Sequence, residues 1–400
     1  MFKIKILTFF AIHKIILLLS YLFPRNKNIW VFGSFNGCFN DNSKYLFLDI
    51  YENHQEITPV WISENKKLVS DLRKKKIKAY YKWSLVGIYF CLRGKVYFYN
   101  AYITDINNYF YAGAIRFNLW HGTPMKKIEF DIKKGKLATV FNNSLRAKII
   151  NDKHYIKPSY ILSMSKKVSS WFSSAFKLDI CKCLEFGYPR NDLLLYPLHQ
   201  VCKFIDTYED KYIKNFINTL KEYKRVYIYM PTWRDDNSDF IQDSDMNFEV
   251  LNTVLKEESS VLILKLHTNT KLNLKINYEN LLILKSSVDV YPILPFTNIL
   301  ITDYSSIIFD YKLMNNKKVI LFPFDINSYI SKYREMYFDY DKFSRSEITV
   351  YNFNDLLNVV KNIDKFVNEE NTLLNEIIQA HDLRQSNYKI IKFVKSKLGI

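Results

Sequence analysis

The stretch NIWVFGSF, residues 28–35, decides the class of fold, because it is a short apolar run that ends in glycine, serine and a polar loop. The segment KYLFLDIYENH, residues 44–54, then follows with a helical pattern. The same order recurs where TPVWIS, residues 58–63, precedes NKKLVSDLRKKK, residues 65–76. Short apolar strands that alternate with helices predict a parallel β-sheet that is covered on both faces.

The alternation starts again in the second half of the chain. RVYIYMPTW, residues 225–233, predicts a strand that enters a loop, and NFEVLNTVLKEE, residues 247–258, predicts a helix. Two doubly wound domains are therefore expected, with their join near GYPRNDLLL, residues 187–195. Such domains bind ligands in a cleft at the carboxyl ends of their strands. Further strands are expected at KVYFYNAYI (95–103), RFNLW (116–120), SVLILKLHT (260–268) and KVILFPFD (318–325).

The composition limits the class of partner. The chain has 400 residues, of which 48% are hydrophobic, so it can bury more than one core. Its net charge of +17 should attract nucleic acid, anionic lipid head groups or phosphate-rich substrates. The five cysteines form no CxxC pair, which argues against a zinc site or a disulfide scaffold and fits a reducing cytosol.

The first 24 residues, MFKIKILTFFAIHKIILLLSYLFP, are apolar but contain Lys3, Lys5 and Lys14. The uncharged run from Ile15 to Phe23 is shorter than the roughly 20 residues that span a bilayer. We expect a basic apolar helix that lies in the membrane interface, and the alternative is a helix that packs on the protein itself.

Five polar clusters share one placement, since each follows a strand-like run. They are HGTP at 121–124, GYPRND at 187–192, PTWRDD at 231–236, KLHTNT at 265–270 and TDYSSIIFD at 302–310. Polar groups at the carboxyl ends of parallel strands are where α/β sites are built.

Three of these clusters carry groups that suit an anionic ligand. Ser305 and Ser306 open a helical segment, whose N–H groups and dipole favour a phosphate, although plain N-capping is the alternative. Arg190 can fork onto a pyrophosphate or form an inter-domain salt bridge. Lys265 and His267 alternate on an expected buried strand, where cations need an anion. A histidine that is satisfied by backbone would explain His267 but not Lys265.

Other enzyme classes lack their motifs. There is no P-loop, GxGxxG or GxSxG, which disfavours kinase-like NTPases, Rossmann dehydrogenases and serine hydrolases. There is no HExxH, and the carboxylate pair Asp243 and Asp245 is weak support for a metal. No recognised nucleic-acid-binding module is present either.

Taken together, HGTP, GYPRND, PTWRD, KLH and TDYSSIIFDY resemble the motifs of the CDP-glycerol glycerophosphotransferase family, in the expected order from Asn118 to about Tyr311. That resemblance implies a GT-B architecture, with two Rossmann-like domains that face an inter-domain cleft. The implied boundaries are a membrane-associating helix at 1–25, an acceptor-side domain at 26–190, a CDP-donor-binding domain at 191–375 and a C-terminal helix at 376–400.

The resemblance also implies the site. His121 and His267 are the catalytic candidates, with His121 as general base, and Lys265 and Arg190 offset phosphoryl charge. Asn269 stands where the family often has proline. The implied CDP-polyol-binding residues are His121, Gly122, Thr123, Pro124, Met125, Arg190, Pro231, Thr232, Lys265, Leu266, His267, Ser305, Ser306 and Asp310.

The expected activity is transfer of a polyol phosphate, glycerol phosphate in the first instance, from a CDP-linked donor to a hydroxyl of a lipid-linked or growing polymer of teichoic-acid or capsule type, with release of CMP. No cofactor is expected to be required, and a divalent metal is an open alternative that the sequence does not indicate. The expected partners are the CDP-polyol, a polyol-phosphate or glycan acceptor and an anionic membrane surface, but not nucleic acid. The expected place is the cytoplasmic face of a bacterial membrane, peripherally attached.

Three alternatives stay open. They are a CDP-ribitol ribitolphosphotransferase, a GT-B glycosyltransferase that uses a sugar nucleotide, and a membrane-bound assembly factor without catalysis. The acceptor also stays open, because the chain has little room for an added acceptor domain.

Overall fold

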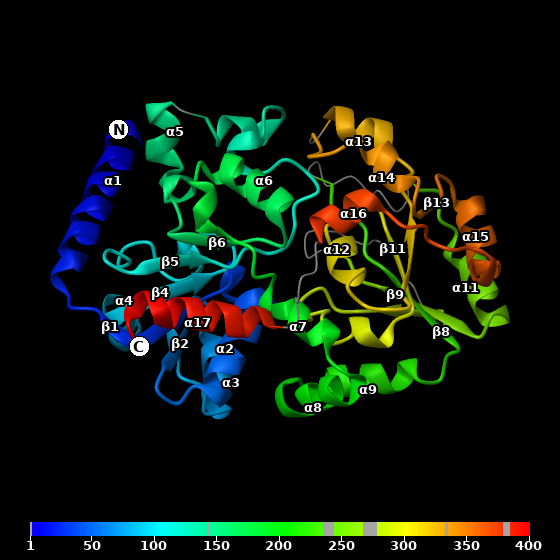
Figure 1. Ribbon diagram of the computed structural model, residues 1–400, viewed down its shortest axis with the longest axis horizontal. Helices are drawn as coiled ribbons and strands as arrows, with labels where there is room; N and C mark the ends of the chain where they lie inside the picture. The colour runs from blue at the N-terminus through cyan, green and yellow to red at the C-terminus, as the bar shows by residue number, and fades with distance from the viewer. Residues whose placement is uncertain (1, 143, 235–243, 267–277, 333–334, 379–384) are drawn as a thin grey trace. The chain divides into compact units, whose positions relative to one another are not determined.

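The computed structural model describes the chain except for residues 1, 143, 235–243, 267–277, 333–334 and 379–384. The chain forms two compact units (Figure 1). Unit 1 comprises Met1–His121, Ile128–Asp192 and Ala380–Ile400, and unit 2 comprises Gly122–Lys127 and Leu193–Gln379. The chain thus enters unit 2 briefly after His121 and returns to unit 1 at its end.

Unit 1 is built on a seven-stranded sheet in the order β3-β2-β1-β4-β5-β6-β7. All of its strand pairs are parallel. The order 3-2-1-4-5 is that of a Rossmann fold, in which the direction of winding reverses between β1 and β4. The strands are β1 (Asn26–Phe32), β2 (Thr58–Ser63), β3 (Ala79–Tyr81), β4 (Gly94–Tyr99), β5 (Ile115–Asn118), β6 (Tyr160–Leu162) and β7 (Cys183–Leu184).

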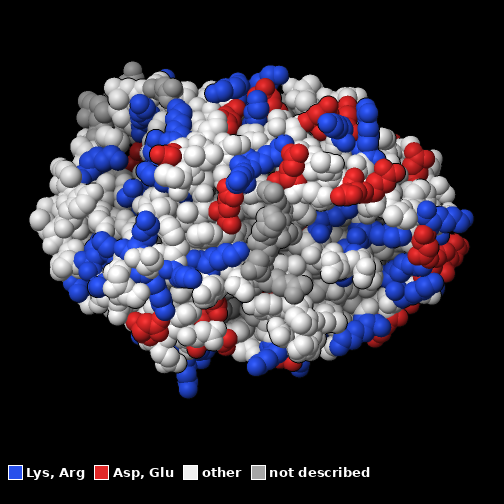
Figure 2. Space-filling view, in the orientation of Figure 1, with Lys and Arg blue, Asp and Glu red and all other residues white. Residues whose placement is uncertain are grey.

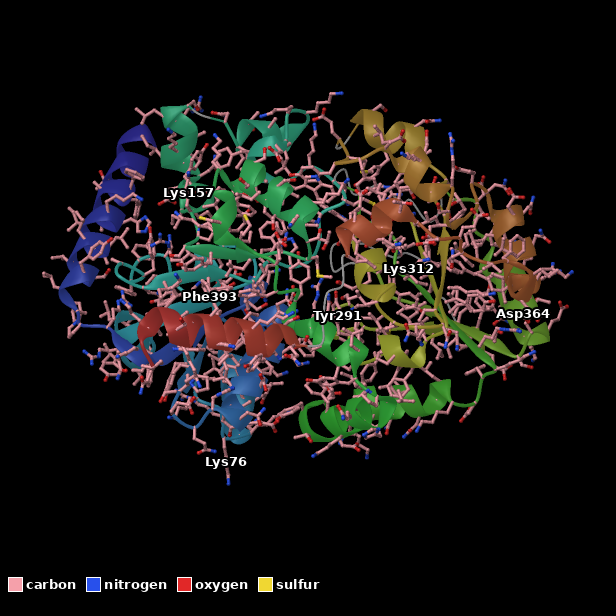
Figure 3. All side chains as sticks on the ribbon, in the orientation of Figure 1. Lys76, Lys157, Tyr291, Lys312, Asp364 and Phe393 are labelled. Carbon is pink, nitrogen blue, oxygen red and sulfur yellow. The ribbon has the colours of Figure 1, made fainter. Side chains whose placement is uncertain are left out.

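The helices of unit 1 connect these strands and cover the sheet. Phe393 of the last helix, α17, lies edge-on to Tyr160, with ring centroids 4.9 Å apart (Figure 3). Asp192 caps that helix, because its carboxylate accepts from the backbone N–H groups of Ser386 and Asn387. The helices are α1 (Phe2–Leu19), α2 (Asp41–Asn53), α3 (Lys66–Lys74), α4 (Leu85–Arg93), α5 (Leu145–Ile150), α6 (Lys166–Phe176), α7 (Pro189–Leu195), which contains the unit boundary, and α17 (Ser386–Leu398).

Arg25 anchors the segment between α1 and β1. Its guanidinium donates to the backbone carbonyls of Cys91, Gly94, Phe110 and Ala112. A planar guanidinium with several N–H donors can bind carbonyls from separate segments at once. Arg25 therefore ties the segment just before β1 to the end of α4, to the start of β4 and to the loop that precedes β5.

Unit 2 repeats the same topology. Its six strands run in the order β10-β9-β8-β11-β12-β13, again all parallel. Counted from its first strand, this is the Rossmann order 3-2-1-4-5-6, with the switch between β8 and β11. The strands are β8 (Arg225–Tyr229), β9 (Ser260–Leu264), β10 (Leu281–Ile283), β11 (Ile299–Thr302), β12 (Lys318–Leu321) and β13 (Ile348–Thr349).

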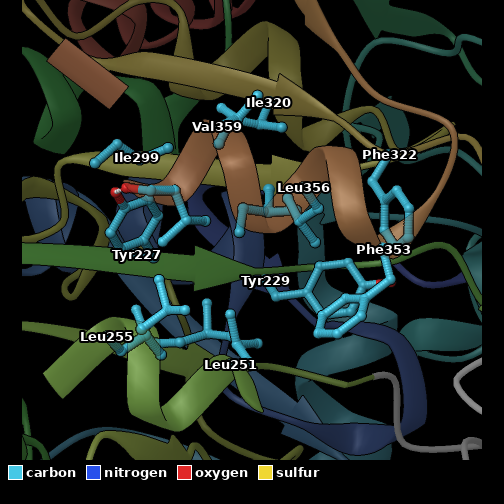
Figure 4. Close-up of a cluster of buried hydrophobic side chains, with 14 of the residues drawn as sticks. Tyr227, Tyr229, Leu251, Leu255, Ile299, Ile320, Phe322, Phe353, Leu356 and Val359 are labelled. Atoms are coloured by element: carbon cyan, nitrogen blue, oxygen red, sulfur yellow. Dashed lines mark hydrogen bonds between the residues drawn. The ribbon is translucent and has the colours of Figure 1, made fainter. Parts of the chain in front are cut away.

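The core of unit 2 is packed between its sheet and two helices (Figure 4). Tyr227 and Tyr229 of β8 project on the same side as Leu251 of α11 and Leu356 of α15, and all four are buried. This alternation is what a strand with a period of two residues places on one face. The described helices of unit 2 are α8 (Leu198–Tyr208), α9 (Lys211–Leu220), α11 (Phe248–Glu257), α12 (Ile307–Tyr311), α13 (Ile326–Lys332), α14 (Tyr340–Ser344), α15 (Phe353–Lys361) and α16 (Thr372–Ile377).

The predicted α/β architecture with two parallel sheets is confirmed. Each quoted apolar run contains a strand, and TPVWIS coincides with β2. One detail differs, because β9 ends at Leu264 and Lys265 therefore lies beyond the strand instead of on it.

The N-terminal helix is present as α1, and its described side chains, from Thr8 onward, divide into a buried face and an exposed face. His13 is buried, whereas Phe9 and Leu18 are 70% and 65% exposed. Among the described residues, no helix combines the length and the apolar character needed to cross a bilayer.

Candidate active site

The switch point of unit 1 carries a network of polar side chains. Ser34 follows β1 and Asn100 follows β4, and the Asn100 amide donates to the Ser34 hydroxyl over 2.9 Å. The Asn100 side-chain oxygen accepts from Ser43 in α2 over 2.9 Å. Gly33 is needed here, since a Cβ on it would lie 2.3 Å from the carbonyl oxygen of Asp105. The loops after β1 and β4 are thereby locked together.

His121 adjoins this network just beyond β5. Its Nδ1 lies 3.2 Å from the carbonyl oxygen of Asn100. A carbonyl only accepts, so Nδ1 carries the proton and Nε2 keeps its lone pair. The residues on either side have positive φ angles, 53° at Trp120 and 128° at Gly122. A tryptophan in the left-handed region is strained, and such strain is often found at functional sites.

An ion pair stands beside this imidazole. Arg190, at the start of α7, donates from Nη1 to Oδ1 of Asp41 over 2.7 Å, and both side chains are largely removed from water. The Arg190 backbone N–H donates to Asn42, whose side-chain amide donates to the carbonyls of Leu119 and Trp120. Arg190 is thus in a salt bridge within unit 1, which differs from the inter-domain pair considered as an alternative.

These neighbours set the charge state of His121. Desolvation is the main cause that lowers the pKa of His121 below the ordinary histidine value. The carboxylate of Asp41 acts in the opposite direction and raises it, and Arg190 lowers it. The imidazole is therefore neutral at neutral pH and can accept a proton.

The rest of the HGTP segment belongs to unit 2. Met125 accepts at its carbonyl from the backbone N–H of Tyr337 over 3.0 Å, and Lys126 forms an antiparallel bridge with Met336. Thr123 is buried, and its hydroxyl has no hydrogen-bond partner among the described residues. A buried hydroxyl of this kind is suited to bind a ligand.

The switch point of unit 2 is also locked by polar groups. After β8, the Thr232 backbone N–H donates over 2.8 Å to Asp303, which follows β11. Arg234 is 1% exposed and donates to both Asp303 and Asp325. The Thr232 hydroxyl is buried without a hydrogen-bond partner in the described part of the chain. This arrangement holds Pro231 and Thr232 at the carboxyl end of the sheet.

Of the predicted pair Lys265 and His267, only Lys265 lies among the described residues. The Lys265 ammonium donates to the carbonyls of Lys285, Ser286 and Val288, at 2.9, 2.8 and 2.8 Å. Its three donors are satisfied by backbone, so an anion is not needed to explain it, and burial lowers its pKa to about 8. Leu266 is buried. His267 lies outside the described residues, as does Asp243 of the weak carboxylate pair.

The serine group is placed at the start of α12. Within the described chain, Ser306 makes no side-chain capping hydrogen bond, so plain N-capping does not account for it. Both serines are half-buried. Asp310 accepts from the hydroxyl of Tyr291 over 2.6 Å.

The structure brings His121 and Arg190 together in unit 1, and Thr232 and the TDYSS segment together in unit 2. It adds Asp41, Asn100 and Asp303, which were not among the predicted site residues. Asp303 lies within the TDYSS motif, so its place was signalled. Asp41 and Asn100 follow no polar motif and acquire their role only through contacts with distant residues.

Two Rossmann-like units, each with a polar network at its switch point, define the class of α/β enzymes that bind ligands at the carboxyl ends of parallel strands. Sequence comparison then specifies the family. The chain belongs to the CDP-Glycerol:Poly(glycerophosphate) glycerophosphotransferase family, whose pattern matches residues 15–394. The predicted family resemblance is thereby confirmed, and the chain is an enzyme of the transferase class.

Several relatives are similar over most of this chain. The teichoic acid glycerol-phosphate transferase of Staphylococcus aureus (strain NCTC 8325 / PS 47) is 28% identical, with 86% of each chain covered. The teichoic acid poly(glycerol phosphate) polymerase of Bacillus subtilis (strain 168) is 27% identical, but the match spans 82% of this chain and only 43% of that protein.

A solved structure of the wall teichoic acid polymerase TagF superimposes with a TM-score of 0.72 at 23% identity, covering 94% of this chain and 90% of that one. This likeness confirms the predicted GT-B fold class.

Proposed function

We propose that this protein transfers glycerol phosphate from CDP-glycerol to a terminal hydroxyl of a teichoic-acid-type polymer and releases CMP. The observation that carries the proposal is the placement of His121, a neutral imidazole with a free Nε2, in a chain that matches the glycerophosphotransferase family almost throughout. The similarity to a glycerol-phosphate transferase supports glycerol over ribitol.

The reaction requires removal of one proton. The acceptor hydroxyl attacks the phosphorus atom that bears the glycerol, the bond from that phosphorus to the CMP oxygen breaks, and CMP leaves. We assign His121 as the general base that takes the hydroxyl proton at Nε2. The Asn100 carbonyl holds the Nδ1 proton, and the Asp41 carboxylate stabilises the imidazolium that forms.

We assign the CDP donor to the remaining motif residues. The hydroxyls of Thr123 and Thr232 are buried without described partners, so they can donate to phosphate or ribose oxygens. Ser305, at the start of α12, adds a further hydroxyl. We propose that these groups, together with His267, bind the donor without a metal cofactor, which turnover in the presence of EDTA would test.

We also propose peripheral attachment to the membrane. Two elements of unit 1 support it. The exposed apolar side chains of α1 include Phe9 and Leu18, and α4 begins with Leu85, which is 88% exposed, next to Trp83. Trp83 lies against Tyr109, which in turn contacts His13 of α1, so the two apolar areas are neighbours. Exposed apolar groups near lysines are typical of interfacial helices.

The test is nucleotide release from purified protein. CDP-glycerol, CDP-ribitol and a sugar nucleotide are supplied in turn with a glycerol-phosphate oligomer as acceptor. We expect CMP from CDP-glycerol, and His121→Ala should lower kcat/KM by about 10²- to 10⁴-fold, the usual contribution of a general base, while donor binding survives. Full turnover by His121→Ala would remove it from the base role. A nucleoside diphosphate released from the sugar nucleotide would support a glycosyltransferase instead.

A further inference from the structure

Unit 1 contains a cavity of about 690 Å³ beside α1, and its described lining shares no residue with the polar network around His121. Its size lies within the range of small-molecule sites, about 300–1,000 Å³. Five cationic side chains line it: Lys14, Arg116, Lys148, Lys157 and Lys177. Asp152 is the one carboxylate among the described lining residues. Such an excess of positive charge favours an anionic ligand.

Asp152 does not offset the whole cluster, because its charge is engaged at the α1 side of the cavity. It lies 2.8 Å from Nδ1 of His13 and 3.7 Å from the ammonium of Lys14. The hydrogen bond to Asp152 is the main cause that raises the pKa of His13. The carboxylate is therefore shared between His13 and Lys14.

Contacts with backbone and aromatic rings hold these cations in place. The Arg116 guanidinium donates to the carbonyl of Lys157 over 2.9 Å, and the Lys157 ammonium donates to the carbonyl of Lys177. The Lys177 ammonium lies 4.1 Å from the ring centroid of Phe130. Desolvation first, and then Lys133, Lys148 and Lys157, lower the pKa of Lys177. An anion bound among these like charges would relieve their repulsion.

The surroundings of the cavity are apolar. Phe10 and Leu17 of α1 line it directly. α5, which packs against α1, carries Lys148 into the lining and also presents Leu145 and Ile150, which are 73% and 50% exposed. Figure 2 shows Lys and Arg gathered over this part of the molecule, where Figure 3 labels Lys157. Cations set among exposed apolar side chains match a ligand with a charged head and a hydrocarbon tail.

We propose that this cavity binds the phosphate head group of an anionic membrane lipid, with the hydrocarbon chains lying along α1 and α5. The cations bind the phosphodiester, and Phe10, Leu17 and the exposed residues of α5 contact the glycerol and acyl portion. The site rests on the proposed membrane attachment and gives it a lipid specificity that apolar contacts alone do not supply. It takes no part in the transfer step.

The test compares binding to vesicles of phosphatidylcholine with and without phosphatidylglycerol, by co-sedimentation at 0.15 M salt. A cavity variant carries Lys148→Gln, Lys157→Gln and Lys177→Gln. A control with the same loss of charge carries substitutions to Gln at Lys67, Lys78 and Lys182, which are exposed lysines of unit 1 outside the cavity lining. One lysine at an anionic surface strengthens binding roughly fivefold, so the cavity variant should lose about 100-fold on the anionic vesicles.

The control should lose less than fivefold, and both variants should bind neutral vesicles as the wild type does. Equal loss in the two variants would overturn the site in favour of unspecific electrostatics. The single change Lys148→Gln, on the exposed face of α5, keeps the test valid if the triple variant does not fold, and it should lose roughly fivefold. No loss in that variant would overturn the proposal.

Three further measurements separate the sources of failure. A variant with Phe9→Ser and Leu18→Ser should lose binding to both kinds of vesicle, which tests the membrane attachment itself. Glycerol 3-phosphate at millimolar concentration should not displace the protein from anionic vesicles; displacement would mean that a free phosphate suffices and would overturn the lipid assignment. CMP release with a soluble acceptor should be unchanged in the cavity variant, and its loss would place the lysines in the transfer site instead.

Discussion

The ion pair between Asp41 and Arg190 allows a test of how His121 is tuned. Asp41→Asn and Arg190→Gln each remove one charge and keep a side chain of similar size. Nη1 of Arg190 and Oδ1 of Asp41 are 2.7 Å apart, and the side chains are 5% and 19% exposed, respectively, so either change removes the ion-pair partner of a largely desolvated charge. Breaking a buried pair costs about 3–5 kcal/mol. We expect about 3 kcal/mol, because Asp41 retains some access to water.

The two substitutions should have opposite effects on the pH dependence of the reaction. A general base must be neutral, so kcat/KM falls as the pH drops below the pKa of His121. The Asp41 carboxylate raises that pKa and Arg190 lowers it. Asp41→Asn should therefore move the acidic limb of the profile to lower pH, and Arg190→Gln should move it to higher pH.

The assay is CMP release across the pH range at low CDP-glycerol concentration, together with urea denaturation of each variant. The matched control is Glu347→Gln, which breaks another buried pair, with Lys312, whose ammonium lies 2.7 Å from the carboxylate. The control should be destabilised to a similar degree without any movement of the acidic limb. Limbs that stay in place, or that move in the same direction in both variants, would refute the role of the pair in tuning His121.

Two further predictions concern stability. Arg25→Met leaves four carbonyl groups without their shared donor, and each buried acceptor that loses its donor costs about 1–3 kcal/mol, so the free energy of unfolding should fall by at least about 3 kcal/mol in urea melts. Arg146→Met, on an exposed position, should change it by less than about 0.5 kcal/mol. Burial raises the pKa of Asp192 to about 7, well above the value of about 3.9 in an unfolded chain. The native state therefore holds the proton of Asp192 more tightly than the unfolded chain does, and the free energy of unfolding should decline as the pH rises from about 4 to about 7. Thermal melts of Asp192→Asn should lack this part of the decline. A decline identical to that of the wild type would contradict the assignment.

The fold could be predicted from sequence because its signals are local. The strands at 58–63 and 225–229 are mostly apolar, because both faces of a parallel sheet are buried. Two short edge strands escaped prediction. β3 has only three residues, Ala79–Tyr81, which is too short for any period to show. β13, Ile348–Thr349, has two residues and lies at the edge of the second sheet.

The site could be predicted only where its residues cluster in the chain. HGTP follows a strand directly, so its place was visible. Asp41 was not, since it looks like an ordinary first residue of a helix, and its role depends on Arg190, 149 residues later. Its φ of 58° lies in the left-handed region. Lys265 was a different case: the sequence shows a cation without a partner, but not the three carbonyls of a later loop that satisfy it.

The two units solve the same structural problem with different chemistry. In each unit, a side chain just after the fourth strand along the chain (β4 or β11) is hydrogen-bonded to the loop after the first strand (β1 or β8). In unit 1 the Asn100 amide donates to Ser34, and in unit 2 the Asp303 carboxylate accepts from the Thr232 backbone N–H. In unit 1 the network continues through the Asn100 carbonyl to His121, a group that can change its protonation state.

In unit 2 the network continues to Arg234, which stays charged and is bound by Asp303 and Asp325. A group that titrates near neutral pH can transfer a proton, whereas a permanently charged group that is fully engaged can only hold its neighbours in place. This difference supports the division of labour that we propose. Unit 1 supplies the base that activates the acceptor hydroxyl, and unit 2 supplies a rigid frame for the hydroxyls that bind the donor.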